Sequence, residues 1–470
     1  MKFEKLFNNS KYVYDFLRKS YMTLFIFAVL TRVLMPIALR ETQFINDLVF
    51  SSVAIFGAFV LLFDLFTRRI MLTSKNVFWL LGFLLVCIIS SIINVKYGLY
   101  GNIKNAVWLA ISFFFFFFLD KERSLDEVKK EIKYVSNVLI AVWFAACSVS
   151  LTMFLFQMGY YVDVYPNSFS RQGFIEGRLF GIFEDPNFAA VVAIIVIILS
   201  IFNLFTISNR LLKAFYIISI IINFLYVVLS GSRTAEVAFA VTVLISSYFI
   251  LKKKDNLRKV NLIIKQVIMV ITSLICSAIL LLSISITRKG LSYIPSFIDS
   301  PFTKTGNLEN RIKKPVDTTR EDIGNGADIS NCRFKIWVSA LELFKSKPIF
   351  GTSPRNMRIY AKTEFPHGFI AKRSYAVHNA YIDVLTSTGI VGATCILVFF
   401  LKYLYDIFKY LFSSCKSDNY YIVLFNVSIV STVAVAALFL SEIFFVNTIG
   451  VLMFWSNLGY SYYFMKESKS

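Results

Sequence analysis

The sequence predicts an all-α integral membrane protein with about twelve transmembrane helices. Of its 470 residues, 57% are hydrophobic and 17% are charged, whereas a soluble domain has roughly 45–50% apolar and about 25% charged residues. The apolar residues gather in runs of about 20, each long enough to cross a hydrocarbon layer about 30 Å thick. Lipid offers backbone polar groups no partners, and these runs lack the two-residue alternation of barrel strands. Helices are therefore predicted.

Each apolar run lies between polar or basic segments and is predicted to be one transmembrane helix. A basic start precedes the first run and no small-residue cleavage site follows it, so this run is predicted to be an uncleaved span. Residues 1–470 are expected to form a single polytopic membrane domain. The predicted spans are residues 21–40, 44–66, 77–95, 105–119, 134–157, 187–207, 214–230, 234–251, 266–286, 380–401, 420–440 and 443–464.

The formal net charge of +20 follows the membrane topology. Lys and Arg concentrate in short segments on one side of the predicted spans, for example at Arg68, Arg69 and Lys252 to Lys254. This distribution is typical of cytoplasmic loops, and it places both termini in the cytoplasm. It also explains the charge without a nucleic-acid partner. The six cysteines show no disulfide framework and no CxxC spacing.

Two segments on the opposite side are unusually long for this chain. One runs from Met158 to Pro186. The other, residues 287–378, is predicted to be a large extracytoplasmic loop between spans nine and ten. A loop of this length without a span of its own usually has a function.

One stretch of this loop, Arg333 to Ser346, is predicted to be an amphipathic helix on the bilayer surface. Trp337, Leu341 and Phe344 recur at helical spacing. Lysines on the same stretch are expected to reach lipid phosphates; they are Lys335 and Lys345.

The chain has two histidines, His367 and His378, and the topology places both outside. His378 directly precedes the tenth span. A histidine at a helix start is either a buried capping side chain or a general base, and taken alone it favours the structural interpretation. His367, between Pro366 and Gly368, is expected to be a loop residue.

Three arginines on the same side change that weighting. Arg178 precedes the sixth span, Arg233 lies in the turn before the eighth span, and Arg333 lies in the long loop. Each has a structural alternative: snorkelling at the interface for Arg178, an ion pair with Glu236 for Arg233 and a solvated loop face for Arg333. A planar guanidinium is also well suited to a diphosphate, because it engages two phosphate oxygens at once. The pattern suggests an outward-facing anion site near a histidine.

Four motifs follow one another on this side. They are Gly-Arg-Leu-x-Gly-x-Phe-x-x-Pro-Asn from residue 177, Ser-Gly-Ser-Arg-Thr from residue 230, Arg-x-x-x-Trp from residue 333 with Lys-Pro-Ile-Phe-Gly from residue 347, and His-Asn-x-Tyr from residue 378, which ends in Gly389-x-x-Gly392. Their order, spacing and shared face resemble the O-antigen ligase and polymerase superfamily of bacterial surface-polysaccharide assembly, over about residues 170–395. One departure is Thr352-Ser353-Pro354, where the family often has another glycine after Gly351.

The resemblance implies a type-C glycosyltransferase-like enzyme of the bacterial cytoplasmic (inner) membrane, with an undecaprenyl-diphosphate-linked glycan as donor and acceptor. It implies that Arg178, Arg233 and Arg333 bind the donor diphosphate and stabilise its developing charge. His378 would accept the proton of the attacking sugar hydroxyl, whose direct attack inverts the anomeric configuration.

Three further residues are candidates for orienting the sugar or the histidine: Asn187, Asn379 and Tyr381. Both asparagines are equally candidates for helix caps. The resemblance implies no metal and no other cofactor, and the outer segments hold no Asp-x-Asp pair or His/Cys cluster. Besides membrane lipid, the expected partners are a chain-length regulator and a flippase.

Other functions remain open at this stage. A polymerase of repeat units is favoured over a ligase that transfers the glycan to a lipid core, because polymerases are the more divergent members and no feature for a lipid-core acceptor is visible. A transporter or flippase would suit the polar residues Asp64, Asp383 and Glu442 within or beside the spans. These residues lie near span ends, however, and paired broken helices in matching halves are not visible. Nothing positive supports a non-catalytic scaffold.

Overall fold

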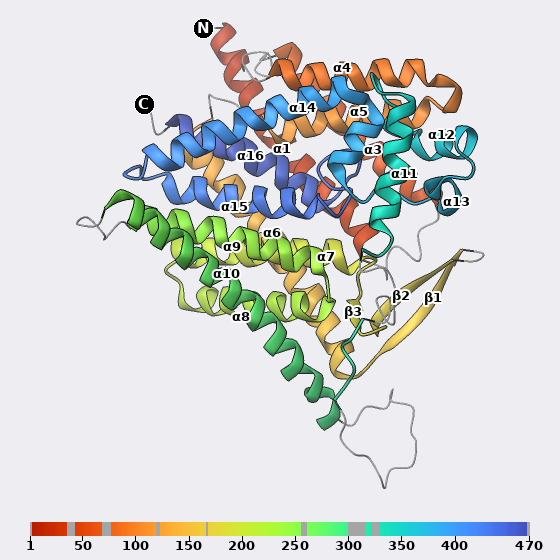
Figure 1. Ribbon diagram of the computed structural model, residues 1–470. Coiled ribbons are helices and arrows are strands. Elements are labelled where there is room, and N and C mark those ends of the chain that lie inside the picture. Colours follow the sequence, from red (N-terminus) through yellow and green to blue (C-terminus); the bar gives the residue numbers. More distant parts are fainter. Residues whose placement is uncertain are drawn as a thin grey trace. The chain divides into compact units, whose positions relative to one another are not determined.

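The computed structural model describes residues 2–34, 43–67, 77–118, 123–165, 168–254, 261–298, 315–320 and 330–467 (Figure 1). The chain divides into two compact units, which are described here one at a time. Unit 1 comprises Met1–Val29, Phe44–Val128 and Cys332–Ser470, and unit 2 comprises Leu30–Gln43 and Lys129–Asn331.

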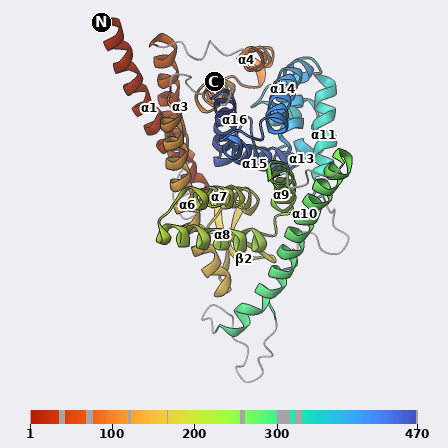
Figure 2. The ribbon, with the colours of Figure 1, turned by 90° about the vertical axis from the view of Figure 1, so that its left-hand side faces the viewer.

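Unit 2 combines long apolar helices with one small sheet. The sheet is antiparallel, with strand order β1-β2-β3, and α7 packs along α8 while α9 packs along α10 (Figures 1 and 2). The elements are most of α6 (Leu125–Leu155), β1 (Gly159–Tyr165), β2 (Ser168–Ile175), β3 (Arg178–Gly181), α7 (Pro186–Thr206), α8 (Arg210–Ser230), α9 (Arg233–Lys254), α10 (Leu262–Tyr293) and the 3-10 turn η4 (Ile294–Phe297).

Unit 1 holds the remaining helices. Helix α14 packs along α4 and α11, and α15 packs along α16. The elements are most of α1 (Lys2–Val33), then α3 (Gln43–Thr67), α4 (Val77–Ile93), the 3-10 turn η2 (Val95–Tyr97), α5 (Tyr100–Ile111) with a π-helical continuation η3 (Ser112–Phe116), α11 (Arg333–Ser346), α12 (Met357–Glu364), α13 (Phe369–Arg373), α14 (Ala380–Ser413), α15 (Tyr420–Ala436) and α16 (Ile449–Glu467).

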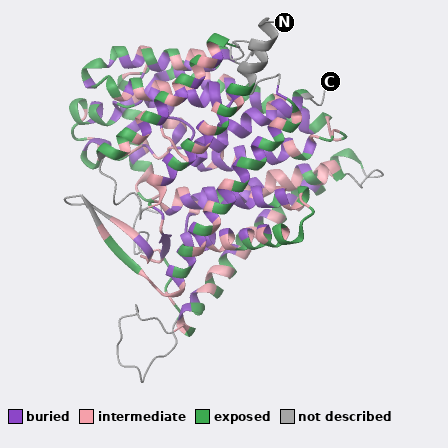
Figure 3. Ribbon diagram, turned by 180° about the vertical axis from the view of Figure 1, so that it is seen from behind, coloured by how far each residue is buried: buried purple, intermediate pink, exposed green. Residues whose placement is uncertain are grey.

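The predicted fold class is confirmed: within the described residues, each predicted span falls mainly on helical residues. Among the described residues, seven helices are long and apolar enough to cross a membrane, namely α3, α6, α7, α8, α9, α10 and α14, and α4 and α15 are shorter apolar helices. Buried and exposed residues alternate around the helices (Figure 3), as expected of helices that pack on one face and meet lipid on another. Residues 35–40 of the first predicted span lie outside the described residues, as do Arg68 and Arg69.

The sheet between α6 and α7 was not predicted. Strands β2 and β3 are joined by Glu176 and Gly177, whose φ angles are 54° and 69°. Positive φ at both central residues defines the two-residue hairpin turn that matches strand twist, and glycine adopts it without steric cost. A Glu-Gly pair directly after the apolar Phe174-Ile175 was the available signal, but a search for long apolar runs does not detect it.

The last two spans are shorter than predicted. Helix α15 ends at Ala436 and α16 begins at Ile449, so an irregular segment, residues 437–448, replaces their predicted ends. Ile443 and Phe445 have positive φ angles there. Glu442 is buried in this segment, and the Thr448 hydroxyl donates a hydrogen bond to its Oε2 at 2.6 Å. The polar side chain thus sits in a helix break with a hydrogen-bonding partner.

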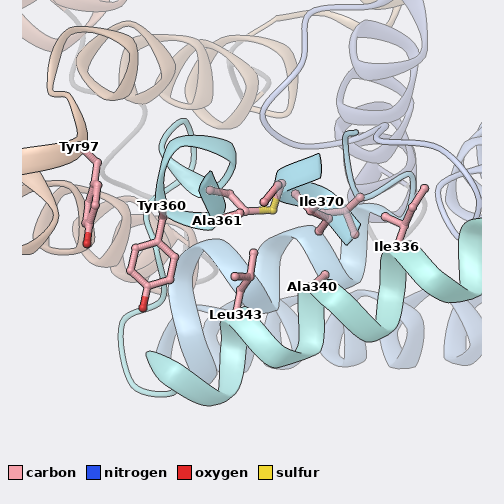
Figure 4. Close-up of a cluster of buried hydrophobic side chains, with 10 residues drawn as sticks. Tyr97, Ile336, Ala340, Leu343, Tyr360, Ala361 and Ile370 are labelled. Atoms are coloured by element: carbon pink, nitrogen blue, oxygen red, sulfur yellow. The ribbon is translucent and has the colours of Figure 1, made fainter. Parts of the chain in front are cut away.

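Helix α11 has the predicted bounds, and it also buries a face against protein that the sequence did not predict. The buried side chains are Ile336, Ser339, Ala340 and Leu343. Among them, Ile336, Ala340 and Leu343 point towards Tyr360, Ala361 and Ile370 of α12 and α13 (Figure 4). Of the predicted apolar residues, only Trp337 is partly buried against this cluster, whereas Leu341 is exposed. The prediction allowed for no partner helices within the loop, and the apolar side of α11 packs on them.

Candidate functional site

Arg178 is the first residue of β3, directly after the Glu176-Gly177 turn. Its side chain is buried, with 6% of its surface exposed. The guanidinium Nε donates to the Ser230 carbonyl at 2.9 Å, and Nη2 donates to Asn187 Oδ1 at 2.9 Å. Both acceptors are neutral, so they orient the guanidinium without cancelling its charge. Interface snorkelling does not describe this buried, doubly anchored side chain.

Asn187 contributes to the candidate site through its hydrogen bond with Arg178, and it is not the N-cap of α7. The cap of α7 is Asp185, whose Oδ1 accepts from the Asn187 backbone N–H at 2.7 Å and from its side-chain amide at 2.9 Å. This fixes the Asn187 amide so that its oxygen faces Arg178. The cap alternative for Asn187 was therefore wrong, because the acidic residue two positions earlier fills that role.

Arg233 is the first residue of α9, in the turn to which Arg178 is bound. Helix α8 ends with Gly231 in the left-handed conformation (φ 60°), and the Ser232 hydroxyl accepts from the Ala235 N–H at 3.3 Å. Arg233 is partly exposed. The structure thus brings Arg178, Asn187 and the turn that carries Arg233 together.

Glu236, the predicted alternative partner of Arg233, forms an ion pair with Arg288 of α10. Arg288 also donates through Nε to the Val228 carbonyl at 2.9 Å. This pair joins α9 to α10 just behind the Ser230–Arg233 turn.

Sequence analysis missed a further arginine at this turn. Arg320 lies in the short described segment 315–320, and its Nη1 donates to the Gly231 carbonyl at 3.0 Å. Arg178 and Arg320 are therefore bound to consecutive carbonyls of one turn. No sequence motif pointed to Arg320, because its position depends on how a long loop folds back.

In unit 1, His378 is partly buried and has a φ angle of 51°. A left-handed conformation is uncommon for a residue with a side chain, and such strain tends to occur at functional sites. The cap of α14 is the next residue, Asn379, whose Oδ1 accepts from the N–H groups of Tyr381 and Ile382, each at 3.0 Å. Capping is therefore confirmed for Asn379, and His378 stands one residue before the cap.

Tyr381 and the start of α14 are tied to the end of α15. The Tyr381 hydroxyl donates to the Ala434 carbonyl at 2.9 Å, and the Ala380 N–H donates to the Ala437 carbonyl at 2.9 Å. These bonds fix the backbone on the C-terminal side of His378.

Arg333 is the first residue of α11. Its guanidinium carbon lies 5.7 Å from the centroid of Phe439, close enough for a cation–π contact. Trp337, one turn along, has its ring centroid 6.4 Å from that of Phe439. Arg333 and His378 thus both lie beside the segment that follows α15.

Lys347 attaches helices α11 to α13 to another part of unit 1. Its ammonium donates to Asn94 Oδ1 at 2.6 Å and lies 5.3 Å from the Tyr360 ring centroid. Burial, with a smaller contribution from the neighbouring Lys96, lowers the pKa of Lys347. The Lys-Pro-Ile-Phe-Gly motif therefore begins with a lysine that joins two parts of the unit.

The end of this motif and the two residues after it pack into a break in α14. Gly389 has φ 65° and ψ −167°, which interrupts the helix. The Thr352 and Ser353 N–H groups donate to the carbonyls of Thr386 and Ser387, each at 2.9 Å. A broken helix thus regains partners for its freed carbonyls from a buried loop.

Residues 218–397 match a family model described as O-Antigen ligase. The matched segment contains Arg233, Arg320, Arg333 and His378, and Arg178 precedes it. No curated protein matches the chain. The match confirms the predicted resemblance to the O-antigen ligase and polymerase superfamily, whose members act on lipid-linked glycans. Together with the apolar helices, it supports an O-antigen ligase- or polymerase-type function in a multi-pass membrane protein.

Proposed function

We propose that this protein polymerises undecaprenyl-diphosphate-linked oligosaccharide repeat units into O-antigen or capsular polysaccharide, by inverting glycosyl transfer on the outer face of the bacterial inner membrane. The observation that carries the proposal is the anchoring of Arg178 on the turn that leads to Arg233, within and beside a segment similar to O-antigen ligases. The proposal includes the orientation in which both termini lie in the cytoplasm and residues 287–378 on the outer side.

The chemistry assigns one task to the arginines. As the acceptor hydroxyl oxygen bonds to the anomeric carbon, the bond from that carbon to the diphosphate oxygen breaks, and negative charge grows on the leaving diphosphate. Cations already fixed by hydrogen bonds stabilise this charge without reorganising during the reaction. Arg178 and Arg233 serve this purpose in the proposal, and Arg333 holds the donor or the loop.

The second task is removal of the hydroxyl proton. A neutral imidazole is a suitable base near pH 7, because the reference pKa of histidine is about 6.5. His378 is the proposed base, and the proton it accepts balances the charge that leaves with the diphosphate. Asn379 and Tyr381 act on the backbone beside it, through the cap of α14 and the bond to Ala434.

The proposal is tested with purified full-length protein and a lipid-diphosphate-linked repeat unit. Longer lipid-linked chains and released lipid diphosphate are expected. Movement of the lipid-linked unit across a vesicle membrane without lengthening would instead identify a flippase and overturn the proposal.

A deletion strain separates polymerase from ligase. Surface glycan reduced to single repeat units is the expected result. Accumulation of lipid-linked polymer without surface attachment would identify a ligase instead. A chain-length regulator and a flippase are the expected functional partners of the polymerase.

A further inference from the structure

Residues 315–320, here called the strap, form a described part of the long segment between α10 and α11 that lies in unit 2. Neither the sequence motifs nor the proposed function assigns it a role. Three contacts attach the strap to unit 2, at the end of α10, at the β2–β3 turn before Arg178 and at the α8–α9 turn that carries Arg233.

The first contact is at the end of α10, where the Val316 N–H donates to the Ser292 carbonyl at 2.9 Å. Within the strap, Asp317 Oδ1 accepts from the Thr319 N–H at 2.7 Å, which folds the chain locally. This bond lowers the pKa of Asp317.

The second contact is with the β2–β3 turn. The carbonyl oxygen of Thr319 would lie 1.9 Å from a Cβ atom added to Gly177. Such a distance is impossible for a real side chain, so the strap can occupy this place only because residue 177 is glycine. Gly177 thus serves both the hairpin turn and the position of the strap.

The third contact brings Arg320 to the α8–α9 turn. A Cβ atom on Gly231 would lie 3.5 Å from Cγ of Arg178 and 3.5 Å from Cδ of Arg320, so the two side chains pass the same glycine. Their guanidinium groups bind the consecutive carbonyls of Ser230 and Gly231. Two positively charged side chains therefore lie at one turn, and an anion bound there would be attracted by both.

We infer that Arg320 is a further diphosphate-binding residue, which the strap delivers to the turn between Arg178 and Arg233. The inference rests on the proposed function, and it names the ligand of this part of the site as a diphosphate group. A diphosphate carries several negative charges on two phosphoryl groups. Three guanidinium groups around one turn match it better than two.

The test measures binding of inorganic pyrophosphate to the purified full-length protein by calorimetry. Arg320→Ala is expected to weaken binding about tenfold, as for loss of a hydrogen bond to a charged group. The matched control is Lys289→Ala, which removes one exposed positive charge from the end of α10 that the strap contacts. It should change the affinity for pyrophosphate less than twofold. Thermal unfolding checks that both variants fold.

Two further variants test the position of the strap and the chemistry of the Arg320 side chain separately. Gly177→Ala keeps Arg320 in the chain but displaces the strap, and it is also expected to weaken pyrophosphate binding. Arg320→Lys keeps the charge without the planar fork and should bind with intermediate affinity.

The possible failures are distinguishable. If the wild-type protein binds pyrophosphate and Arg178→Ala loses it while Arg320→Ala does not, the inference is wrong and the proposed function stands. If the wild-type protein does not bind pyrophosphate or a polyprenyl diphosphate, the anion site of the proposed function fails and the inference fails with it.

Discussion

The turn around Arg178 and the helix start at His378 hold their functional side chains by different means. Arg178 is positioned by its own side-chain hydrogen bonds, to Ser230 and Asn187. For His378 the structure shows a backbone in the left-handed conformation, directly before the Asn379 cap of α14. In unit 2 the candidate side chain is thus held by short polar contacts, while in unit 1 the backbone at the start of α14 sets the direction from which the candidate side chain leaves the chain.

This difference predicts where substitutions act. In unit 2, a substitution is expected to affect function mainly where the residue is in direct contact with the α8–α9 turn. In unit 1, the apolar cluster beneath α11 includes Val377, next to His378, and a buried loop packs into the break of α14, the helix that His378 precedes, so distant changes should matter.

The largest effect is expected for His378→Ala. Loss of a general base lowers a rate by about 10²–10⁴-fold, so polymer formation should fall below detection while the protein stays in the membrane. The measurement is the ladder of chain lengths in cells that carry the variant. His367→Ala, which removes the exposed second histidine, is the matched control and should leave the ladder unchanged. A normal ladder in His378→Ala would show that the imidazole is not the base.

Arg178→Lys tests the unit 2 side of the comparison. Lysine keeps the charge, but its single nitrogen cannot reproduce the fork that reaches both Ser230 and Asn187. We expect kcat of the purified enzyme to fall roughly 10–100-fold, somewhat less than for loss of an oxyanion-hole donor. Arg171→Lys is the control, because Arg171 is paired with Glu176 on the sheet. Equal activity of Arg178→Lys and wild type would mean that charge alone suffices.

The two regions also differ in how far the sequence predicted them. Hydrocarbon thickness sets the length of an apolar run, so the helices were predictable one by one. Arg178, Arg233 and His378 became candidates because they stand beside such runs, and Arg333 became one because it lies in the long loop on the same predicted side. Arg320 was not found, because its place depends on a contact between the strap and Gly177 that no local pattern encodes.

The faces of helices were predicted less well than their bounds. The apolar residues of α11 were visible in the sequence, but which of them are buried depends on α12 and α13, which fold against it. The ends of α15 and α16 were misplaced for a related reason. Residues 437–448 are apolar enough to continue a helix, yet Trp455 Nε1 donates to the Ile443 carbonyl at 2.9 Å within a broken segment.

Gly389→Ala should test the support of unit 1 from a distance. A Cβ atom there would lie 2.2 Å from the Ile349 carbonyl oxygen, and the backbone has φ 65° and ψ −167°. The strain alone is about 1–3 kcal/mol, so the midpoint of thermal unfolding should fall by several degrees and activity with it. Gly290→Ala is the matched control, because a Cβ atom there meets nothing within 4 Å in α10. It should be neutral or slightly stabilising. Equal midpoints for the two variants would contradict the role of the helix break.

The smallest effect is expected at the exposed edge of the same unit, where Glu364 accepts hydrogen bonds from Tyr97 and Lys96. These bonds lower the pKa of the Glu364 carboxyl. A carboxyl whose pKa is lower in the folded state contributes stability above its unfolded pKa, and this contribution is lost as the pH falls through the folded value. Because the group is exposed, solvent screens most of the gain. Glu364→Gln should therefore reduce the acid-induced drop in the unfolding midpoint between about pH 5 and pH 3 by a small amount. Glu342→Gln, an exposed carboxyl on α11, should leave that drop unchanged. If both variants behaved alike, the Lys96–Tyr97–Glu364 contacts would add nothing to the attachment of α12, and Lys347 with the apolar cluster would hold these helices alone.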